Sequence, residues 1–162
     1  MAPYSVPLRL HWLRAVGMPM GVDQLIYAST ANRPLSEVEL SLLLLAARRN
    51  NESLGVTGML LYHDGEFLQV LEGEREAVQA LFGRIARDPR HTRVTLLQRQ
   101  RVVQRQFADW SMGFATLKGL AESLPGHSDF LRHRHEPAKA AGFAAQALVQ
   151  FRDEKFKRHV ER

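Results

Sequence analysis

Alternating hydrophobic and polar residues predict the first elements of the chain. An apolar run at 25–28 gives way to a polar stretch, which predicts a strand followed by a loop. Ser36 and Glu39 then form a capping box, a side-chain pair that starts a helix. We predict a helix from 37 to 51 that stops near Gly55, because glycine readily adopts the left-handed conformation that ends helices.

This first helix is apolar nearly all round between Leu42 and Ala47. A helix that covers a sheet needs only one apolar face, so a second face must also be buried against something. A cofactor, a second helix and a partner protein are the candidates.

Two further apolar runs, 57–62 and 66–71, flank the dipeptide Asp64-Gly65 and predict a β-hairpin. A second helix is predicted over 74–87, because apolar residues recur there along one helical stripe.

The dipeptide Asp88-Pro89 ends the second helix, since the residue before a proline disfavours helical backbone. Two more strands follow, at 92–103 and 109–115. The order strand, helix, strand, strand, helix, strand, strand predicts an α+β fold. We expect a ferredoxin-like βαββαββ sheet with two helices on one face.

Beyond this core, 130–134 and 138–159 are predicted to be helical and to cover the open sheet face, bind a partner, or both. We divide the chain into an N-terminal extension (1–23), a globular domain (24–117) and a C-terminal helical extension (118–162). The N-terminal extension is either a short amphipathic appendage or the product of a start codon assigned upstream of Met18 or Met20.

Composition narrows the functional classes. The 162 residues contain no cysteine, which excludes disulfides, thiolate metal sites and cysteine nucleophiles. The net charge of +5 comes mostly from the C-terminal tail and lacks the dense basic stripe of a nucleic-acid footprint, so we expect no nucleic-acid partner. No apolar run is long enough to span a bilayer, and we expect a cytoplasmic protein without a membrane partner.

Sequence motifs for hydrolysis or phosphate binding are missing. The chain has no Gly-x-Ser-x-Gly, no His-Glu-x-x-His and no glycine-rich phosphate loop, and its histidines lack the spacing of metal ligands. We therefore expect neither an enzyme nor a metal site.

Three polar residues lie on faces that are otherwise apolar. Tyr27 shares a strand face with Leu25 and Ser29, Gln69 lies in an apolar strand, and Asn51 continues the apolar stripe of the first helix. A buried amide without partners costs about 1–3 kcal/mol, so these groups must bond to something. Either they bond to one another or to nearby backbone as core polar groups, or they bind a ligand.

A second polar group lies near the end of the second helix. Arg84 and Asp88 form an i,i+4 pair at the edge of the apolar stripe, where a donor beside an acceptor matches the imide edge of a flavin. Arg90 and His91 come next and suit a ribityl or phosphate group. The alternatives are a solvated surface ion pair and a solvated basic loop.

Taken in order, these residues resemble the BLUF family (blue light using flavin) over 24–117. The resemblance is carried by five separate blocks: Leu25-Ile26-Tyr27-Ala28-Ser29; Asn50-Asn51 through Gly55-Val56-Thr57-Gly58; Gly65-Glu66-Phe67-Leu68-Gln69-Val70-Leu71-Glu72-Gly73; Arg84-Ile85-Ala86-Arg87-Asp88-Pro89-Arg90-His91; and Phe107-Ala108-Asp109-Trp110-Ser111-Met112-Gly113-Phe114.

The resemblance implies FAD bound without a covalent link between the two helices. Tyr27 would donate an electron and a proton to the excited flavin. Gln69 would lie between Tyr27 and the flavin and switch its hydrogen bonds by rotation or tautomerisation. Asn51 would hydrogen-bond the flavin near its C4 carbonyl.

The remaining roles also follow from the resemblance. Asn50, Arg84 and Asp88 would hold the pyrimidine edge of the flavin, while Leu43 and Ile85 would sandwich its ring. The other implied positions are Ser29 near the cofactor, Arg90 and His91 near the ribityl chain, and Trp110 and Met112 as the signal relay on one face of the last strand.

The resemblance therefore implies a blue-light photoreceptor that signals to a separate effector, either a response-regulator-like protein or a transcriptional regulator. A homo-oligomer is also expected. Two alternatives remain: a ferredoxin-like interaction module without a cofactor, and a small flavin-dependent enzyme. A colourless purified protein would favour the first, and turnover with a nicotinamide donor the second.

Overall fold

The computed structural model describes residues 21–109, 111–116, 144, 146–147 and 150–151, which contain five strands and two longer helices. In chain order these are β1 (Val22–Ala31), α2 (Glu37–Leu54), β2 (Thr57–His63), β3 (Glu66–Gly73), α3 (Arg75–Ala86), β4 (His91–Val102) and β5 (Gly113–Thr116). This is the predicted order of elements.

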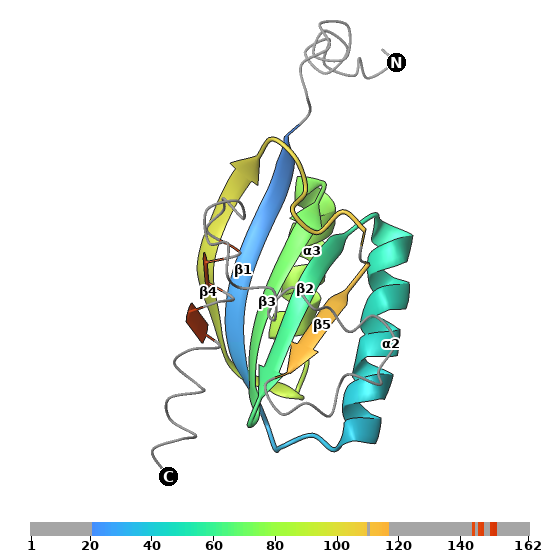
Figure 1. Ribbon diagram of the computed structural model, residues 1–162, viewed down its shortest axis with the longest axis vertical. Coiled ribbons are helices and arrows are strands. Elements are labelled where there is room, and N and C mark those ends of the chain that lie inside the picture. Colours follow the sequence, from blue (N-terminus) through green and yellow to red (C-terminus); the bar gives the residue numbers. More distant parts are fainter. Residues whose placement is uncertain (1–20, 110, 117–143, 145, 148–149, 152–162) are drawn as a thin grey trace, which may run out of the picture.

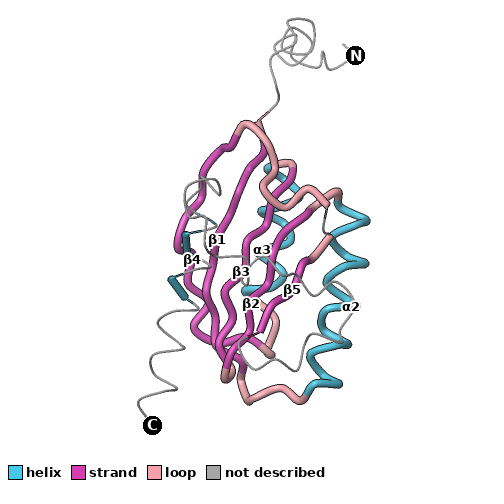
Figure 2. Tube along the Cα trace, in the orientation of Figure 1, coloured by secondary structure: helices cyan, strands magenta, loops and turns pink. Residues whose placement is uncertain are grey.

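The strands form one sheet in the order β4-β1-β3-β2-β5 (Figure 1). β1 pairs antiparallel with both β3 and β4, β2 pairs antiparallel with β3, and β5 adds in parallel to β2. Helices α2 and α3 both pack on one face of this sheet (Figure 2). The predicted ferredoxin-like α+β fold is confirmed.

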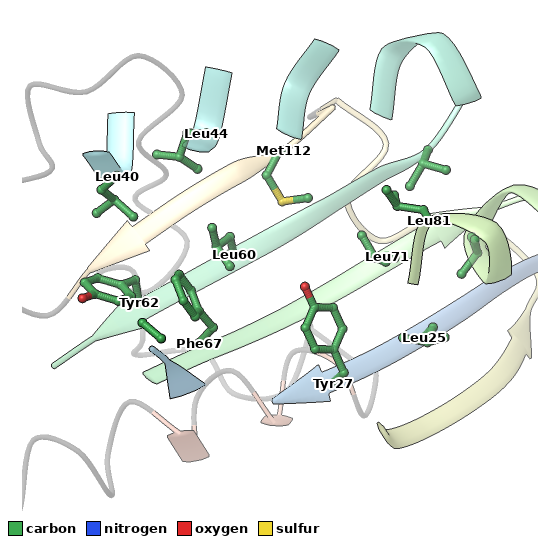
Figure 3. Close-up of a cluster of buried hydrophobic side chains, with 13 residues drawn as sticks. Leu25, Tyr27, Leu40, Leu44, Leu60, Tyr62, Phe67, Leu71, Leu81 and Met112 are labelled. Carbon is green, nitrogen blue, oxygen red and sulfur yellow. The ribbon is translucent and has the colours of Figure 1, made fainter. Parts of the chain in front are cut away.

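The main core lies between the sheet and these two helices. Side chains alternate along each strand, so every second residue points toward the helices. Figure 3 shows this layer, in which Tyr27, Phe67 and Leu60 rise from β1, β3 and β2 on the same side of the sheet. The buried residues that complete it are Leu25, Ala31, Leu40, Leu44, Val56, Tyr62, Leu71, Val78, Leu81 and Met112.

A second apolar cluster lies on the opposite face of the sheet. Its buried strand residues are Ile26, Met59, Leu61, Leu68 and Val70. Ala144 is buried among them, and Ala147 and Phe151 pack against the cluster. Part of the predicted C-terminal helix therefore covers the open sheet face. The predicted helix at 130–134 lies outside the described residues.

Local signals set the ends of α2. The Ser36 Oγ accepts a hydrogen bond from Glu39 N, and the Glu39 carboxylate accepts one from Ser36 N, as the capping box predicts. The helix runs to Leu54, slightly beyond the predicted end, and Gly55 caps it in the left-handed conformation.

The apolar surface of α2 is divided among three environments. Leu44 faces the core, and Leu43 borders a cleft described below. Leu42 and Leu45 are 61% and 48% exposed, so the expected burial of a second complete face is only partly met by the described residues.

The last strand is shorter than predicted. It was expected over 109–115, but β5 begins at Gly113, where pairing with Met59 starts. The carbonyl of Ser111 accepts a hydrogen bond from the side chain of Asn51, and the carbonyl of Met112 accepts one from Arg48. These carbonyls are therefore bonded to α2 side chains, and the predicted placement of Met112 within the strand is wrong. Trp110 lies outside the described residues.

The first strand starts earlier than predicted. β1 begins at Val22, inside the segment assigned to the N-terminal extension, and residues 1–20 lie outside the described residues. Among the helices of the described part, none has both the length and the apolar character needed to cross a bilayer.

A matched pair of glycine substitutions tests the packing. A Cβ on Gly58 would lie 2.0 Å from the Val70 carbonyl oxygen, whereas one on Gly83 of α3 would meet nothing closer than 3.8 Å. We expect Gly58→Ala to lower the free energy of unfolding by at least about 2 kcal/mol, because β2 and β3 must separate. Gly83→Ala should raise it by about 0.5–1 kcal/mol through helix propensity. Urea unfolding followed by circular dichroism measures both. Equal stability of the two variants would contradict the close approach of β2 and β3.

Candidate functional site

A cleft opens between α2 and α3, with the central strands of the sheet as its floor. The floor residues are Tyr27 of β1, Leu60 of β2, and Phe67 and Gln69 of β3. The walls and rim are formed by Leu43, Ala46, Ala47, Asn50 and Asn51 of α2, by Leu81, Arg84 and Ile85 of α3, and by Asp88, Arg90 and His91 after it.

Two polar side chains meet on the floor of the cleft. Tyr27 and Gln69 are opposite each other in the β1–β3 ladder, and the phenol Oη of Tyr27 donates a hydrogen bond to Gln69 Oε1. The other end of the amide, Nε2, lies 3.4 Å from the sulfur of Met112. Both polar ends of Gln69 are thereby engaged by buried neighbours.

The Tyr27 phenol is held in its neutral form. The side chain is fully buried, and burial raises the pKa of the Tyr27 phenol above its ordinary value. The negative charge of Asp88 raises that pKa further. The ring packs against Phe82, with centroids 5.3 Å apart. A neutral phenol is a hydrogen-bond donor, which matches its bond to Gln69.

The two walls of the cleft are apolar. Leu43 projects from α2 and Ile85 from α3. Ala46 and Ala47 lie beside Leu43, and their small side chains leave space next to the helix. A flat, apolar ring system fits between walls of this kind.

Donors and acceptors are arranged along the rim. Asn50 and Asn51 present amides, which both donate and accept hydrogen bonds, and Arg84 presents only donors. Asn51 is buried, and its Nδ2 donates to the carbonyl of Ser111 at 2.6 Å. The expected bond from Asn51 to a flavin remains a prediction.

Asp88 pairs differently from the sequence prediction. Its carboxylate binds Arg90, with 2.6 Å between Oδ2 and Nη2, and does not form the predicted ion pair with Arg84. The reason is that α3 ends at Ala86, so Asp88 lies beyond the regular helix. Hydrogen bonds from Arg90 lower the pKa of Asp88 to about 2, and the carboxylate is an acceptor at neutral pH.

His91 closes one end of the floor. Its Nδ1 lies 2.9 Å from Ser29 Oγ, and its ring packs on Phe67 with centroids 5.0 Å apart. Burial lowers the pKa of His91, so the ring favours its neutral form. Ser29 contacts His91 and is not among the residues that line the cleft.

The structure thus brings together nearly all the predicted cofactor-binding residues. Every one except Ser29 lines the cleft, and Met112 contacts Gln69 from beside it. Sequence reasoning missed five lining residues: Ala46, Ala47, Leu60, Phe67 and Leu81. Adjacent alanines in an otherwise leucine-rich helix were the available signal for the first two.

The donor set fits a flavin. An isoalloxazine ring has apolar faces and a pyrimidine edge on which N–H and C=O groups alternate. The cleft supplies aliphatic walls from Leu43 and Ile85. Its rim supplies donors from Arg84, mixed groups from Asn50 and an acceptor from Asp88.

Comparisons with known proteins agree with this geometry. The family model BLUF, described as sensors of blue-light using FAD, matches residues 22–113. Photoactivated adenylate cyclase subunit beta from Euglena longa is 40% identical over 102 residues, which are 62% of this chain and 12% of that protein. The chain therefore spans only a small part of the length of this relative.

Solved structures are also similar. The dark-state structure of BlrB, a BLUF protein, aligns with a TM-score of 0.60 and 30% identity over 81% of this chain and 97% of that chain. The ground state of BlsA aligns with a TM-score of 0.56 and 35% identity over 59% of this chain and 64% of that chain. With its family model matched over more than half its length, the chain belongs to the BLUF family of sensors of blue light.

Proposed function

We propose that this protein is a blue-light photoreceptor that binds FAD without a covalent bond and signals through hydrogen bonds of Tyr27 and Gln69. The observation that carries the proposal is the buried Tyr27–Gln69 pair on the floor of a cleft lined with flavin-compatible groups. The absence of cysteine fits a photocycle that forms no sulfur adduct.

The residues that would hold the cofactor follow from the cleft. Leu43 and Ile85, which line the cleft from opposite helices, would contact the two ring faces, and Asn50, Arg84 and Asp88 would bond the pyrimidine edge. When bound, the flavin absorbs blue light and in its excited state is a strong oxidant.

Tyr27 is the electron donor of the site. It is a fully buried phenol whose raised pKa keeps the proton on Oη before illumination. When the ring gives up an electron, the acidity of that proton rises sharply, and Gln69 Oε1 is the hydrogen-bond acceptor already in place. Electron and proton therefore leave the same side chain.

Gln69 is the switch. Its oxygen faces Tyr27 and its nitrogen faces the sulfur of Met112. An amide that rotates or tautomerises exchanges donor and acceptor ends, so the same side chain supports two hydrogen-bond patterns. The thioether sulfur only accepts hydrogen bonds, and it therefore favours the pattern in which Nε2 faces Met112.

We further propose that the signal passes to a separate effector, response-regulator-like or a transcriptional regulator, and that the sensor forms homo-oligomers. Support comes from the path through β3. Gln69 points to the cleft, while its neighbours Leu68 and Val70 point to the opposite face, where Ala144 is buried among them. The residues on either side of Gln69 therefore pack against the C-terminal segment, and a movement of Gln69 can reach it through them.

The first test is an absorption spectrum before and after blue illumination. Purified protein should be yellow, release FAD on denaturation, and show a reversible red shift. Tyr27→Phe should keep the colour and lose the shift, because phenylalanine has no proton to transfer. Tyr62→Phe, the same change at another buried tyrosine, is the control and should retain the shift. A colourless protein, or normal photocycling in Tyr27→Phe, would refute the proposal.

Gln69→Leu tests the amide directly. This variant should bind flavin and show no red shift, because leucine has no donor or acceptor to exchange. Gln98→Leu replaces a glutamine of β4 outside the cleft and should behave like the wild type. Light-minus-dark spectra of the two variants provide the comparison. A red shift of normal size in Gln69→Leu would exclude the switch.

The raised pKa of Tyr27 has a consequence at high pH. Because the folded-state pKa lies above the unfolded value of about 10, the stability that this group contributes is complete below pH 10 and declines above it. At about pH 11, one unit above the ordinary value, Tyr27 should remain protonated. Ultraviolet titration of the folded proteins should give equal phenolate absorbance in the wild type and Tyr27→Phe. An excess of one phenolate in the wild type would show that Tyr27 ionises normally.

A further inference from the structure

Three residues of α2 hold the segment Ser111–Met112, which precedes β5. Arg48 Nε donates to the Met112 carbonyl at 3.1 Å, and Asn51 Nδ2 donates to the Ser111 carbonyl at 2.6 Å. Glu52 accepts from Ser111 Oγ at 3.2 Å. Asn51 and Glu52 follow Arg48 by three and four positions, so they lie one turn further along the same side of the helix.

The segment matters because it places the sulfur of Met112. Met112 is 1% exposed, and its sulfur is the neighbour of Gln69 Nε2. Any shift of the Met112 backbone changes this contact. The orientation of the amide therefore depends on what holds residue 112.

The position of the Arg48 side chain is unfavourable for the stability of the fold. It is partly buried, and its Nη2 is buried without a hydrogen-bond partner among the described residues. An unpaired buried donor destabilises a fold, and an aliphatic side chain of similar length would avoid that cost. The hydrogen bond that Arg48 does make goes to the backbone of Met112.

We infer that Arg48 is a positioning residue for the photocycle: by fixing the Met112 carbonyl, it holds the methionine sulfur against Gln69 and favours the dark orientation of the amide. This inference rests on the proposed function. It assigns a role to a residue that does not line the cleft and whose hydrogen bond goes to the Met112 backbone, not to Tyr27 or Gln69.

Recovery in the dark is the kinetic measurement. In Arg48→Met the red shift should form with wild-type amplitude, because Tyr27 and Gln69 are intact. It should decay about tenfold more slowly, because a charge-assisted hydrogen bond that favours the dark orientation is lost. The matched control is Arg49→Met. Arg49 is the next residue of α2, is exposed, and makes no hydrogen bond or ion pair among the described residues. Its recovery should match the wild type.

A double-mutant cycle tests whether Arg48 acts through Met112. Met112→Leu should also slow recovery, since leucine offers no acceptor to Gln69. Adding Arg48→Met to Met112→Leu should then change the rate little, because residues that act on one contact are not additive.

A structural readout accompanies the kinetics. The chain has five methionines, and carbon-13 at their carbonyls gives a signal for Met112 that disappears in Met112→Leu. That signal should move in Arg48→Met and stay in place in Arg49→Met, in flavin-loaded protein kept in the dark. If Arg48→Met does not fold, Arg48→Lys replaces it, since lysine keeps the charge and a donor and should show a smaller effect of the same sign.

The outcomes separate the two proposals. A wild type without a red shift overturns the proposed function, and the inference with it. A photoactive wild type in which both arginine variants recover alike, or in which the effects of Arg48→Met and Met112→Leu multiply, overturns the role of Arg48 alone.

Discussion

The hydrogen bond between Tyr27 and Gln69 is the interaction on which the site depends. The two residues are directly opposite on the central strands β1 and β3, so the ladder that builds the sheet also fixes their distance and face. Both side chains are buried, so they hydrogen-bond to protein groups instead of to water. A polar pair in this position restricts the sequence more than an apolar pair would, because each group must find its partner inside the core.

The cleft exists because α2 and α3 cover the same sheet face while small and aliphatic side chains separate them above this pair. Ala46 and Ala47 leave space, Leu43 and Ile85 line it, and the charged side chains lie at its rim. This arrangement suits a flat ring with a polar edge. The carboxylate of Asp88, held by Arg90, belongs to the rim and also acts on the Tyr27 pKa. The loop after α3 thus lines the cleft and also raises the pKa of the Tyr27 phenol.

Side chains and backbone of the sheet and of α2 hold the connection between β4 and β5 at several points, which include the hydrogen bonds of Arg105 to Gly55, Thr57 and Glu72. Glu72 of β3 accepts hydrogen bonds from the backbone N–H groups of Gln106 and Phe107, at 3.1 and 3.0 Å. Near its other end, α2 side chains bond the carbonyls of Ser111 and Met112. Gln69 and Glu72 lie three residues apart on one strand and face opposite sides of the sheet, so β3 contacts both ends of this connection. The proposed switch residue and the residue that holds the start of this connection therefore lie on one strand.

The sequence by itself determined the order of elements, the capping box at Ser36, the turn at Asp64-Gly65 and ten of the fifteen residues that line the cleft. These features depend on local spacing, or on motifs that the family shares. Only the tertiary structure decided that Asp88 pairs with Arg90, that β5 starts at Gly113, and that Arg48 reaches the Met112 carbonyl. The pairing of Asp88 depends on where α3 ends, and the other two features depend on groups that folding brings together. For the last two, the groups lie about sixty residues apart, where periodicity along the chain carries no information.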